Sequence, residues 1–409
     1  MLKRIRHRLL SGQGRRSEAI AEPRQSAGFR ADQNVTVFMA NRFANGIHQV
    51  LAFYRSGFLD PEKVPIVFQY FETSFASTVE HCEANGIEWS CFVTNGQRPD
   101  ISSPLILYPF NNPANASLVA QRGNRHVLLM HGESNKVALV KPIARLYDHV
   151  LVAGDLAAER LVEFGIMTQA DIDGGRAIKA GTSVVGALPA LRAARAGEEG
   201  ALAYCPTWEG GNDDEDLCSL GWSTPTILRV AKLNNINRLV LRLHPHTGER
   251  LHPLRQAATS LVEAALSEGL HIQYAASSPG TWLEKALAER FPAIEWADAN
   301  MTAVKLALTD VSALEAMMDV LRIPVKVFVD GAKTIAAPKA YLQMCADRLL
   351  WRGQDLTELA LSVPKNGPQM EDYYRHLIGY ETDAQADIPE SKRLDWLSTY
   401  VRDSKLWTG

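Results

Sequence analysis

Residues 238–246 have the sequence RLVLRLHPH, and this stretch decides the fold class. Its apolar residues predict a short buried strand, which Pro245 ends where polar side chains gather. Arg242 and His244 are two positions apart, so they project from one face of that strand. Buried strands with polar groups at their carboxyl ends are typical of parallel sheets, in which ligands bind beyond those ends.

The same pattern recurs on both sides of this stretch, because apolar strands alternate with helical segments. Strands are predicted at 35–40, 64–71, 87–93, 105–108, 126–130, 147–153, 201–205, 238–243, 270–274, 303–308 and 325–329. Helices are predicted at 73–84, 156–164, 224–233, 253–268, 282–290 and 312–321, and mostly helical sequence follows from 339 to 407. This alternation predicts an α/β protein with doubly wound parallel sheets.

The length of the chain predicts two domains. Its 409 residues exceed one ordinary core, and the alternation lapses between 186 and 200. We therefore predict a basic tail (1–30), a first α/β domain (31–190), a second α/β domain (200–380) and a C-terminal helix packed back on the first domain (381–409). Two doubly wound domains facing a cleft, with returning C-terminal helices, form the GT-B arrangement.

The composition, 46% hydrophobic and 22% charged, is that of a globular protein, and a net charge of −3 gives no overall attraction to nucleic acid. The first thirty residues differ, because their cations outnumber Glu18 and Glu22. These cations are Lys3, Arg4, Arg6, Arg8, Arg15, Arg16, Arg24 and Arg30. Two interpretations remain open, a solvated basic tail and a segment that lies on an anionic membrane surface.

The expected location is the cytoplasm, with peripheral attachment at the inner face of the cell membrane if the basic tail binds lipid. No apolar segment follows the first charges as in a signal peptide, and no run of about 18 apolar residues would span a membrane. The five cysteines contain no CxxC pair, so neither a zinc site nor a disulfide framework is predicted. Their odd number suits a reducing compartment.

The segment 131–136, HGESNK, follows a predicted buried strand. Gly132 permits close approach of backbone to a ligand, and Ser134 and Lys136 supply polar groups beside it. His131 has the chemistry of a general base that takes a proton from an acceptor hydroxyl. The alternative is a histidine that caps the next helix or satisfies a loop carbonyl.

Two further strand tips carry groups suited to phosphate. Arg242 offers a bidentate fork and His244 a further donor, unless the two form a salt-bridged pair at a domain edge. Thr207 places a hydroxyl after the strand 201–205, and Trp208 either borders the cleft or packs the hinge. His246 is interpreted as a loop residue.

The segment 310–315, DVSALE, lies between a predicted strand and a predicted helix. Ser312 and Glu315 have the spacing of a capping box, which alone explains both residues. The alternative uses the same helix terminus as a phosphate site, with Asp310 or Glu315 accepting hydrogen bonds from ribose hydroxyls. The acidic loop 213–216 is predicted to be solvated rather than metal-binding, and no phosphate-binding or zinc-protease motif is present.

Taken in order, these motifs resemble those of the bacterial CDP-glycerol glycerophosphotransferases, which include teichoic-acid and capsule polymerases and primases. The resemblance covers roughly residues 120–330. The family segments HG-T-P-x-K, PTWR, R-x-HP and D-Y-S-S correspond to residues 131–136, 206–209, 242–245 and 310–313, with Ile323-Pro324 beyond.

This resemblance implies a GT-B fold and transfer of glycerol phosphate, or a similar polyol phosphate, from a CDP-activated donor to a hydroxyl of a cell-surface polymer or glycolipid, with release of CMP. It implies that the first domain faces the acceptor, with His131 as base and Gly132, Ser134 and Lys136 beside it. The second domain would hold the donor. The implied catalytic and donor-binding residues there are His244, Arg242, Thr207, Asp310, Ser312, Ala313 and Glu315. No cofactor, metal or nucleic acid is implied.

The sequence departs from the family at three motifs. HGTP is replaced by HGES, Glu209 stands in place of the arginine of PTWR, and Ala313 replaces the second serine of DYSS. Glu315 resembles the acidic ribose-binding residue of GT-B sugar transferases. The first alternative function is therefore a GT-B glycosyltransferase with a nucleotide-sugar donor in surface polysaccharide synthesis. A related epimerase and a non-enzymatic binding module are the other two.

Overall fold

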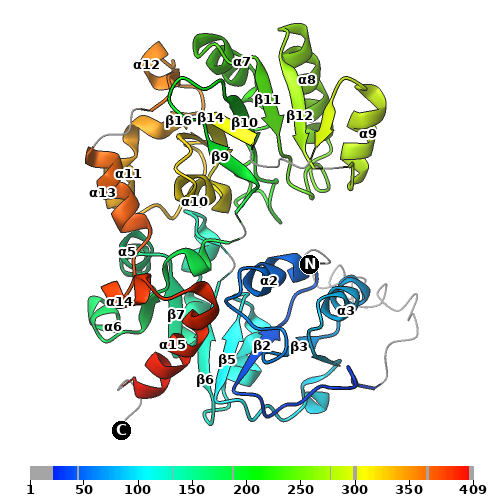
Figure 1. Cartoon of the computed structure of the whole chain (residues 1–409), viewed down its shortest axis with the longest axis vertical. Helices are drawn as coiled ribbons and strands as arrows, with labels where there is room; N and C mark the ends of the chain where they lie inside the picture. Colours follow the sequence, from blue (N-terminus) through cyan, green and yellow to red (C-terminus); the bar gives the residue numbers. More distant parts are fainter. Residues whose placement is uncertain are drawn as a thin grey trace, which may run out of the picture.

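The computed structural model describes residues 22–43, 46–130, 132–186, 188–276, 278–297, 302–364 and 368–404. Two α/β domains are stacked along the long axis of the molecule (Figure 1). His131 and residues 1–21, which include most of the predicted tail, lie outside the described residues. No helix in the described ranges has both the length and the apolar character required to cross a membrane.

The first domain is built on a sheet with the strand order β1-β4-β3-β2-β5-β6-β7-β8. The bounds are β1 (Arg24–Gln25), β2 (Val35–Met39), β3 (Ile66–Gln69), β4 (Trp89–Phe92), β5 (Leu105–Tyr108), β6 (Arg125–Leu128), β7 (His149–Val152) and β8 (Ala177–Lys179). All pairs are parallel except β1 with β4. Since β1 belongs to this sheet, the predicted tail of 1–30 extends too far.

The second domain has the strand order β13-β12-β11-β10-β14-β15-β16, with β9 also paired to β14. The bounds are β9 (Leu191–Ala193), β10 (Ala201–Cys205), β11 (Arg238–Leu241), β12 (His271–Ala275), β13 (Glu295–Ala297), β14 (Thr302–Asp310), β15 (Val325–Val329) and β16 (Leu349–Trp351). Every pairing in this sheet is parallel. The predicted doubly wound α/β architecture is therefore confirmed.

The helices cover the sheets as amphipathic elements with one apolar face. Those of the first domain are α2 (Gly46–Arg55), α3 (Phe75–Ala84), α4 (Ala116–Val119), α5 (Asp155–Glu163) and α6 (Gln169–Asp173). Those that follow are α7 (Thr224–Leu233), α8 (Pro253–Ser267), α9 (Trp282–Arg290), α10 (Ala313–Val320), α11 (Lys339–Met344), α12 (Glu358–Leu361), α13 (Pro368–Leu377), α14 (Asp383–Ala386) and α15 (Glu390–Asp403). The short strands β1, β8, β9, β13 and β16 were not predicted.

The last helices return to the first domain (Figure 1). Helix α13 packs against both α10 and α5. Beyond it, the amide of Gly379 donates to the carbonyl of Ala153, and Arg393 of α15 donates to the hydroxyls of Thr182 and Ser183. One cluster of buried apolar side chains consequently runs from the first sheet into the second. These features give the chain the GT-B arrangement.

Candidate functional site

Each sheet has one point at which the strand order reverses, and ligands of open α/β sheets bind in the crevice beyond that point. In the second domain the reversal lies between β10 and β14. Thr207 follows β10, Arg242 follows the adjacent β11, and Ser312 follows β14. These three predicted donor-side residues therefore follow strands at the switch point of their sheet.

A loop of the first domain inserts beside this point. The ammonium group of Lys136 donates a hydrogen bond to the Thr207 hydroxyl at 2.7 Å. Gly132 lies against the start of α10, where a Cβ atom added to it would be only 2.9 Å from the Cβ of Ala313. Since the φ of Gly132 is also 143°, no other residue suits this position. The structure thus brings Gly132, Lys136, Thr207 and Ala313 together across the domains.

The other members of this loop face inward. Ser134 is buried, and its hydroxyl accepts a long hydrogen bond from the amide of Lys136 at 3.4 Å. Met130, just before the position of His131, has a φ of 62°, a left-handed conformation that costs a non-glycine residue roughly 1–2 kcal/mol. Such strain tends to occur at functional sites.

His244 presents a defined hydrogen-bond donor. The amide of His246 donates to Nδ1 of His244 at 3.2 Å, so the neutral ring carries its proton on Nε2. Burial lowers the pKa of His244 to about 3, and the positive charges of His246, Lys136 and Arg242 act in the same direction. The ring also stacks on Trp208, with 5.7 Å between ring centroids and 15° between planes. His244 is therefore a neutral, oriented donor.

We expect the imidazole signals of His244 to remain unchanged in an NMR titration from pH 8 to pH 5. The folded-state pKa of about 3 lies below the ordinary value of 6.5. The neutral ring therefore contributes stability above pH 6.5, and this stability is lost as the pH falls toward 3. His244→Asn would identify the signals. A titration midpoint above pH 5 would contradict this environment for the ring.

Arg242 is half-buried, and in the described part of the chain its guanidinium has no hydrogen-bond or ion-pair partner. Its positive charge adds to the lowering of the His244 pKa and opposes the rise that burial causes in the pKa of Cys205. A half-buried cation without a protein partner is costly unless an anion binds it. The prediction of a salt-bridged pair at a domain edge is thus not supported.

The start of α10 supplies two further features of the site. Ser312 is the N-cap residue, but its buried hydroxyl has no partner among the described residues. The amides of the first helical turn and the helix dipole favour an anion at this end. Together with Lys136, Arg242 and His244, this terminus forms a cationic site. Burial lowers the pKa of Lys136, while the charges of Asp310 and Glu215 oppose that shift.

Asp310 lies beneath the site rather than on its surface. Its carboxylate is fully buried and accepts hydrogen bonds from the amides of Thr207, at 2.8 Å, and Ser219, at 3.1 Å. Burial raises the pKa of Asp310 to about 7, against the hydrogen bonds from Ser219 and Thr207 that favour the anion. Direct contact with a ribose, as predicted from the sequence, is not available to this side chain.

Glu315 also differs from its prediction. Ser312 makes no side-chain cap, so the predicted capping box is absent. The Glu315 carboxylate instead accepts a hydrogen bond from Tyr341 at 2.6 Å and lies 3.7 Å from Arg348. Burial raises the pKa of Glu315 to about 7, while Arg348 opposes the shift. The Glu315 side chain therefore anchors α10 to Tyr341 and Arg348 and does not face the site at the start of the helix.

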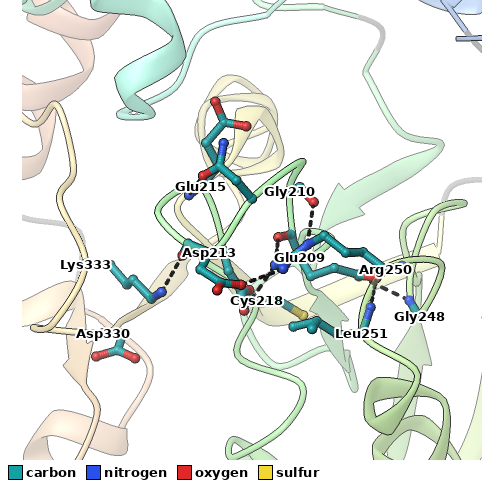
Figure 2. A network of polar contacts seen from close by, with 12 residues as sticks. Glu209, Gly210, Asp213, Glu215, Cys218, Gly248, Arg250, Leu251, Asp330 and Lys333 are labelled. Atoms are coloured by element: carbon teal, nitrogen blue, oxygen red, sulfur yellow. Dashed lines mark hydrogen bonds and ion pairs between the residues drawn. The ribbon is translucent and has the colours of Figure 1, made fainter. Parts of the chain in front are cut away.

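Glu209, which replaces the family arginine, builds a loop (Figure 2). Its buried carboxylate accepts from the amides of Gly248, Arg250 and Leu251 at 2.8–3.1 Å. These hydrogen bonds lower the pKa of Glu209, although burial acts the other way. The Arg250 guanidinium in turn donates to the carbonyls of Glu209 and Gly210 and to Asp213. The loop after Thr207 is therefore held to the segment after β11.

Sequence reasoning missed several residues that shape the site. They are Glu133, Arg160, Asp319, Arg348 and Arg250, and all of these form polar contacts over long sequence distances. Charged residues among the apolar residues of α5 and α10 were the sequence signal that could have indicated buried ion pairs. No group of three or more metal-ligating side chains occurs among the described residues.

The sequence matches no family model and no curated protein. It is similar in structure to the wall teichoic acid polymerase TagF, with 10% identity and a TM-score of 0.43, over 90% of this chain and 88% of that chain. HepE from Anabaena, solved with UDP and glucose, has 8% identity and a TM-score of 0.44, over 91% of this chain and 100% of that chain. The lipopolysaccharide outer core galactosyltransferase WaaB has 8% identity and a TM-score of 0.43, over 90% of this chain and 99% of that chain. At these TM-scores the likenesses add nothing to the fold that the strand order defines.

Proposed function

We propose that the protein is a transferase that moves glycerol phosphate, or a similar polyol phosphate, from a CDP-activated donor to a hydroxyl of a surface polymer or glycolipid, releasing CMP. The observation that carries the proposal is the cationic site at the switch point of the second sheet. There Arg242 lacks a partner among the described residues, Lys136 bonds to Thr207, and the charges of both cations act on the His244 ring, whose Nε2 is a donor.

This site suits a diphosphate. Arg242 offers two parallel hydrogen bonds, and charge-assisted bonds of this kind contribute roughly 1.5–3 kcal/mol each. Neutral His244 adds a donor without demanding a proton. The Ser312 hydroxyl, unpartnered in the described residues, lies with the free amides of α10 at the same place. All of these groups donate hydrogen bonds, as phosphoryl oxygens require.

In the proposed reaction His131 takes the proton of the acceptor hydroxyl. The oxygen attacks the distal phosphorus of the donor, the bond from that phosphorus to the bridging oxygen breaks, and CMP leaves with the electron pair. Arg242, His244 and Ser312 stabilise the charge on the phosphoryl oxygens during this step. Positioning of the two substrates supplies much of the remaining rate acceleration.

The second candidate is a glycosyltransferase in which attack falls on an anomeric carbon and a nucleoside diphosphate leaves. The replacements at Glu209 and Ala313 favour this alternative, because they remove family phosphate ligands. Its sequence support came from Glu315 as a ribose ligand. That carboxylate is engaged by Tyr341 and Arg348, which favours the CDP-polyol donor.

The test is an assay of the full chain with CDP-glycerol, CDP-ribitol and a panel of UDP- and GDP-sugars, each with and without a polyol-phosphate or glycan acceptor. We expect CMP release with extension of the acceptor. We also expect His131→Ala to lower the rate at least about 100-fold, the typical contribution of a general base. Release of UDP or GDP would overturn the proposal in favour of the glycosyltransferase.

The remaining alternatives have separate outcomes in the same assay. Isomerisation of a sugar nucleotide without acceptor would indicate the epimerase. Binding without turnover, together with a biological activity that His131→Ala leaves intact, would indicate a binding module.

A further inference from the structure

A single buried arginine holds the loop that follows His131. Arg160 is on α5 of the first domain and is 4% exposed. Its guanidinium donates to the Glu133 carboxylate at 2.5 Å and to the Asn135 side-chain oxygen at 3.1 Å. A third hydrogen bond, at 3.0 Å, goes to the carbonyl of Ala336 in the second domain. One side chain thus joins two parts of the loop to the other domain.

Ala336 is bonded to the first domain through both its carbonyl and its amide. While the carbonyl of this residue accepts from Arg160, its amide donates to the Asn135 carbonyl at 2.7 Å. One turn along α5, the Glu163 carboxylate accepts from the amide of Lys339, the first residue of α11, at 3.1 Å. The segment 336–339 is therefore fixed to α5 and to the loop at once.

The loop 132–136 consequently touches three separate places in the second domain. Gly132 lies against Ala313, Asn135 bonds to Ala336, and Lys136 bonds to Thr207. These positions follow β14, β15 and β10 respectively. A loop fixed at three points of the second domain keeps its position relative to that domain even if the rest of the first domain shifts.

We propose that Arg160 is a positioning residue that sets the loop 132–136 on the second domain, so that the base of the first domain and the phosphate site of the second are aligned as one unit. This inference rests on the proposed function. Arg160 is buried and its guanidinium is bonded to Glu133, Asn135 and Ala336, so it acts through the loop rather than on a substrate. Its planar fork can satisfy three acceptors in fixed directions, which a lysine ammonium cannot reproduce.

The experiment compares Arg160→Lys with wild type and with Arg176→Lys as a matched control. Arg176 also pairs with a carboxylate, Asp171, and with backbone carbonyls of its own domain, but it makes no bond to the described part of the second domain. Because a misplacement of about 1 Å can cost on the order of 100-fold in rate, we expect Arg160→Lys to lower kcat about 30- to 100-fold. The donor KM should change less than about threefold, and the control should retain wild-type values.

A second readout does not depend on activity. Hydrogen exchange of peptides that contain the Ala336 amide should be at least about tenfold faster in Arg160→Lys than in wild type or in the control, because its acceptor on Asn135 is no longer held. Wild-type exchange and wild-type kcat in Arg160→Lys would overturn the inference. If wild type turns over no donor, the proposed function fails, and the exchange measurement still decides whether Arg160 holds the loop.

Glu133→Gln is the second variant, in case Arg160→Lys does not fold. It removes the charge from the Arg160 pair but keeps the size of the side chain. Because the loop would be misplaced, we expect faster hydrogen exchange at the Ala336 amide and a fall in kcat of at least about tenfold. Wild-type values for both measurements in this variant would equally overturn the inference.

Discussion

Arg242→Ala is expected to lower kcat/KM for the donor by about 100- to 1000-fold, equivalent to about 3–4 kcal/mol of transition-state stabilisation. The half-buried guanidinium has no partner among the described residues and lies with Lys136 and His244 at the switch point. Two charge-assisted hydrogen bonds to phosphoryl oxygens would account for this loss. Since no hydrogen bond or ion pair of the guanidinium in the described ranges is broken, the free energy of unfolding should change little.

Steady-state kinetics and urea unfolding of the same preparations test this expectation. Arg242→Lys keeps the charge but loses the fork, so it should fall between wild type and alanine. Arg250→Ala is the contrasting control, because it breaks the bonds to Glu209 and Asp213 and should reduce stability. If Arg242→Ala retained wild-type kcat/KM with the donor that wild type uses, Arg242 would not be a phosphate ligand.

Arg348→Met is expected to lower the free energy of unfolding by about 3–5 kcal/mol, the typical cost of breaking a buried ion pair. Arg348 is 1% exposed and binds both carboxylate oxygens of Asp319 at 3.0 Å. Glu315 lies 3.7 Å away, and Tyr373 of α13 donates to Asp319 at 2.8 Å. Without the cation, the two buried carboxylates of α10, one turn apart, would repel each other.

The loss should depend on pH in a defined direction. Burial already raises the pKa of Glu315 to about 7 and raises that of Asp319, and Arg348 opposes both shifts. Removing Arg348 raises these folded-state values further above the unfolded ones. The folded variant then binds more protons than its unfolded chain, so its stability falls as the pH rises from about 4 toward the folded pKa.

Urea unfolding at pH 5 and pH 8 measures both effects, and the deficit of Arg348→Met should be larger at pH 8. Arg352→Met serves as the control, because Arg352 forms an exposed pair with Asp330. Exposed pairs contribute about 0–1 kcal/mol. A deficit for Arg348→Met below about 1 kcal/mol at both pH values would show that the buried cluster does not stabilise the fold.

Much of the fold follows from local sequence. Helices α7 and α9 begin and end at the predicted residues, because Pro225 marks one start and a Thr281–Glu284 capping box marks the other. Strand β16 was missed within a region predicted as helical. Three residues are too few to show a period of two, and their pairing with β15 is a tertiary contact.

The contacts of the site residues could be predicted only in part from local sequence. The polar residue types at the strand tips were predictable, since strand ends are marked by Gly and Pro in the sequence. Whether a side chain faces the cleft or the core was not. Asp310 is held by the amide of Ser219, and Glu315 by Tyr341 and Arg348, all distant in sequence. Arg160 and Ala336 are likewise separated by 176 positions.

The return of the C-terminal helices affects how the chain folds during synthesis. Gly154 leaves no room for a side chain, because a Cβ there would lie 2.6 Å from the carbonyl oxygens of His376 and Leu377. The amide of Lys179 donates to Glu381 at 2.6 Å. At about 5–20 residues per second, the ribosome needs roughly 10–40 s to pass from residue 186 to residue 403. Throughout that interval the nascent first domain exposes apolar surface that only the end of the chain will cover, so chaperone engagement is expected to fall in this window.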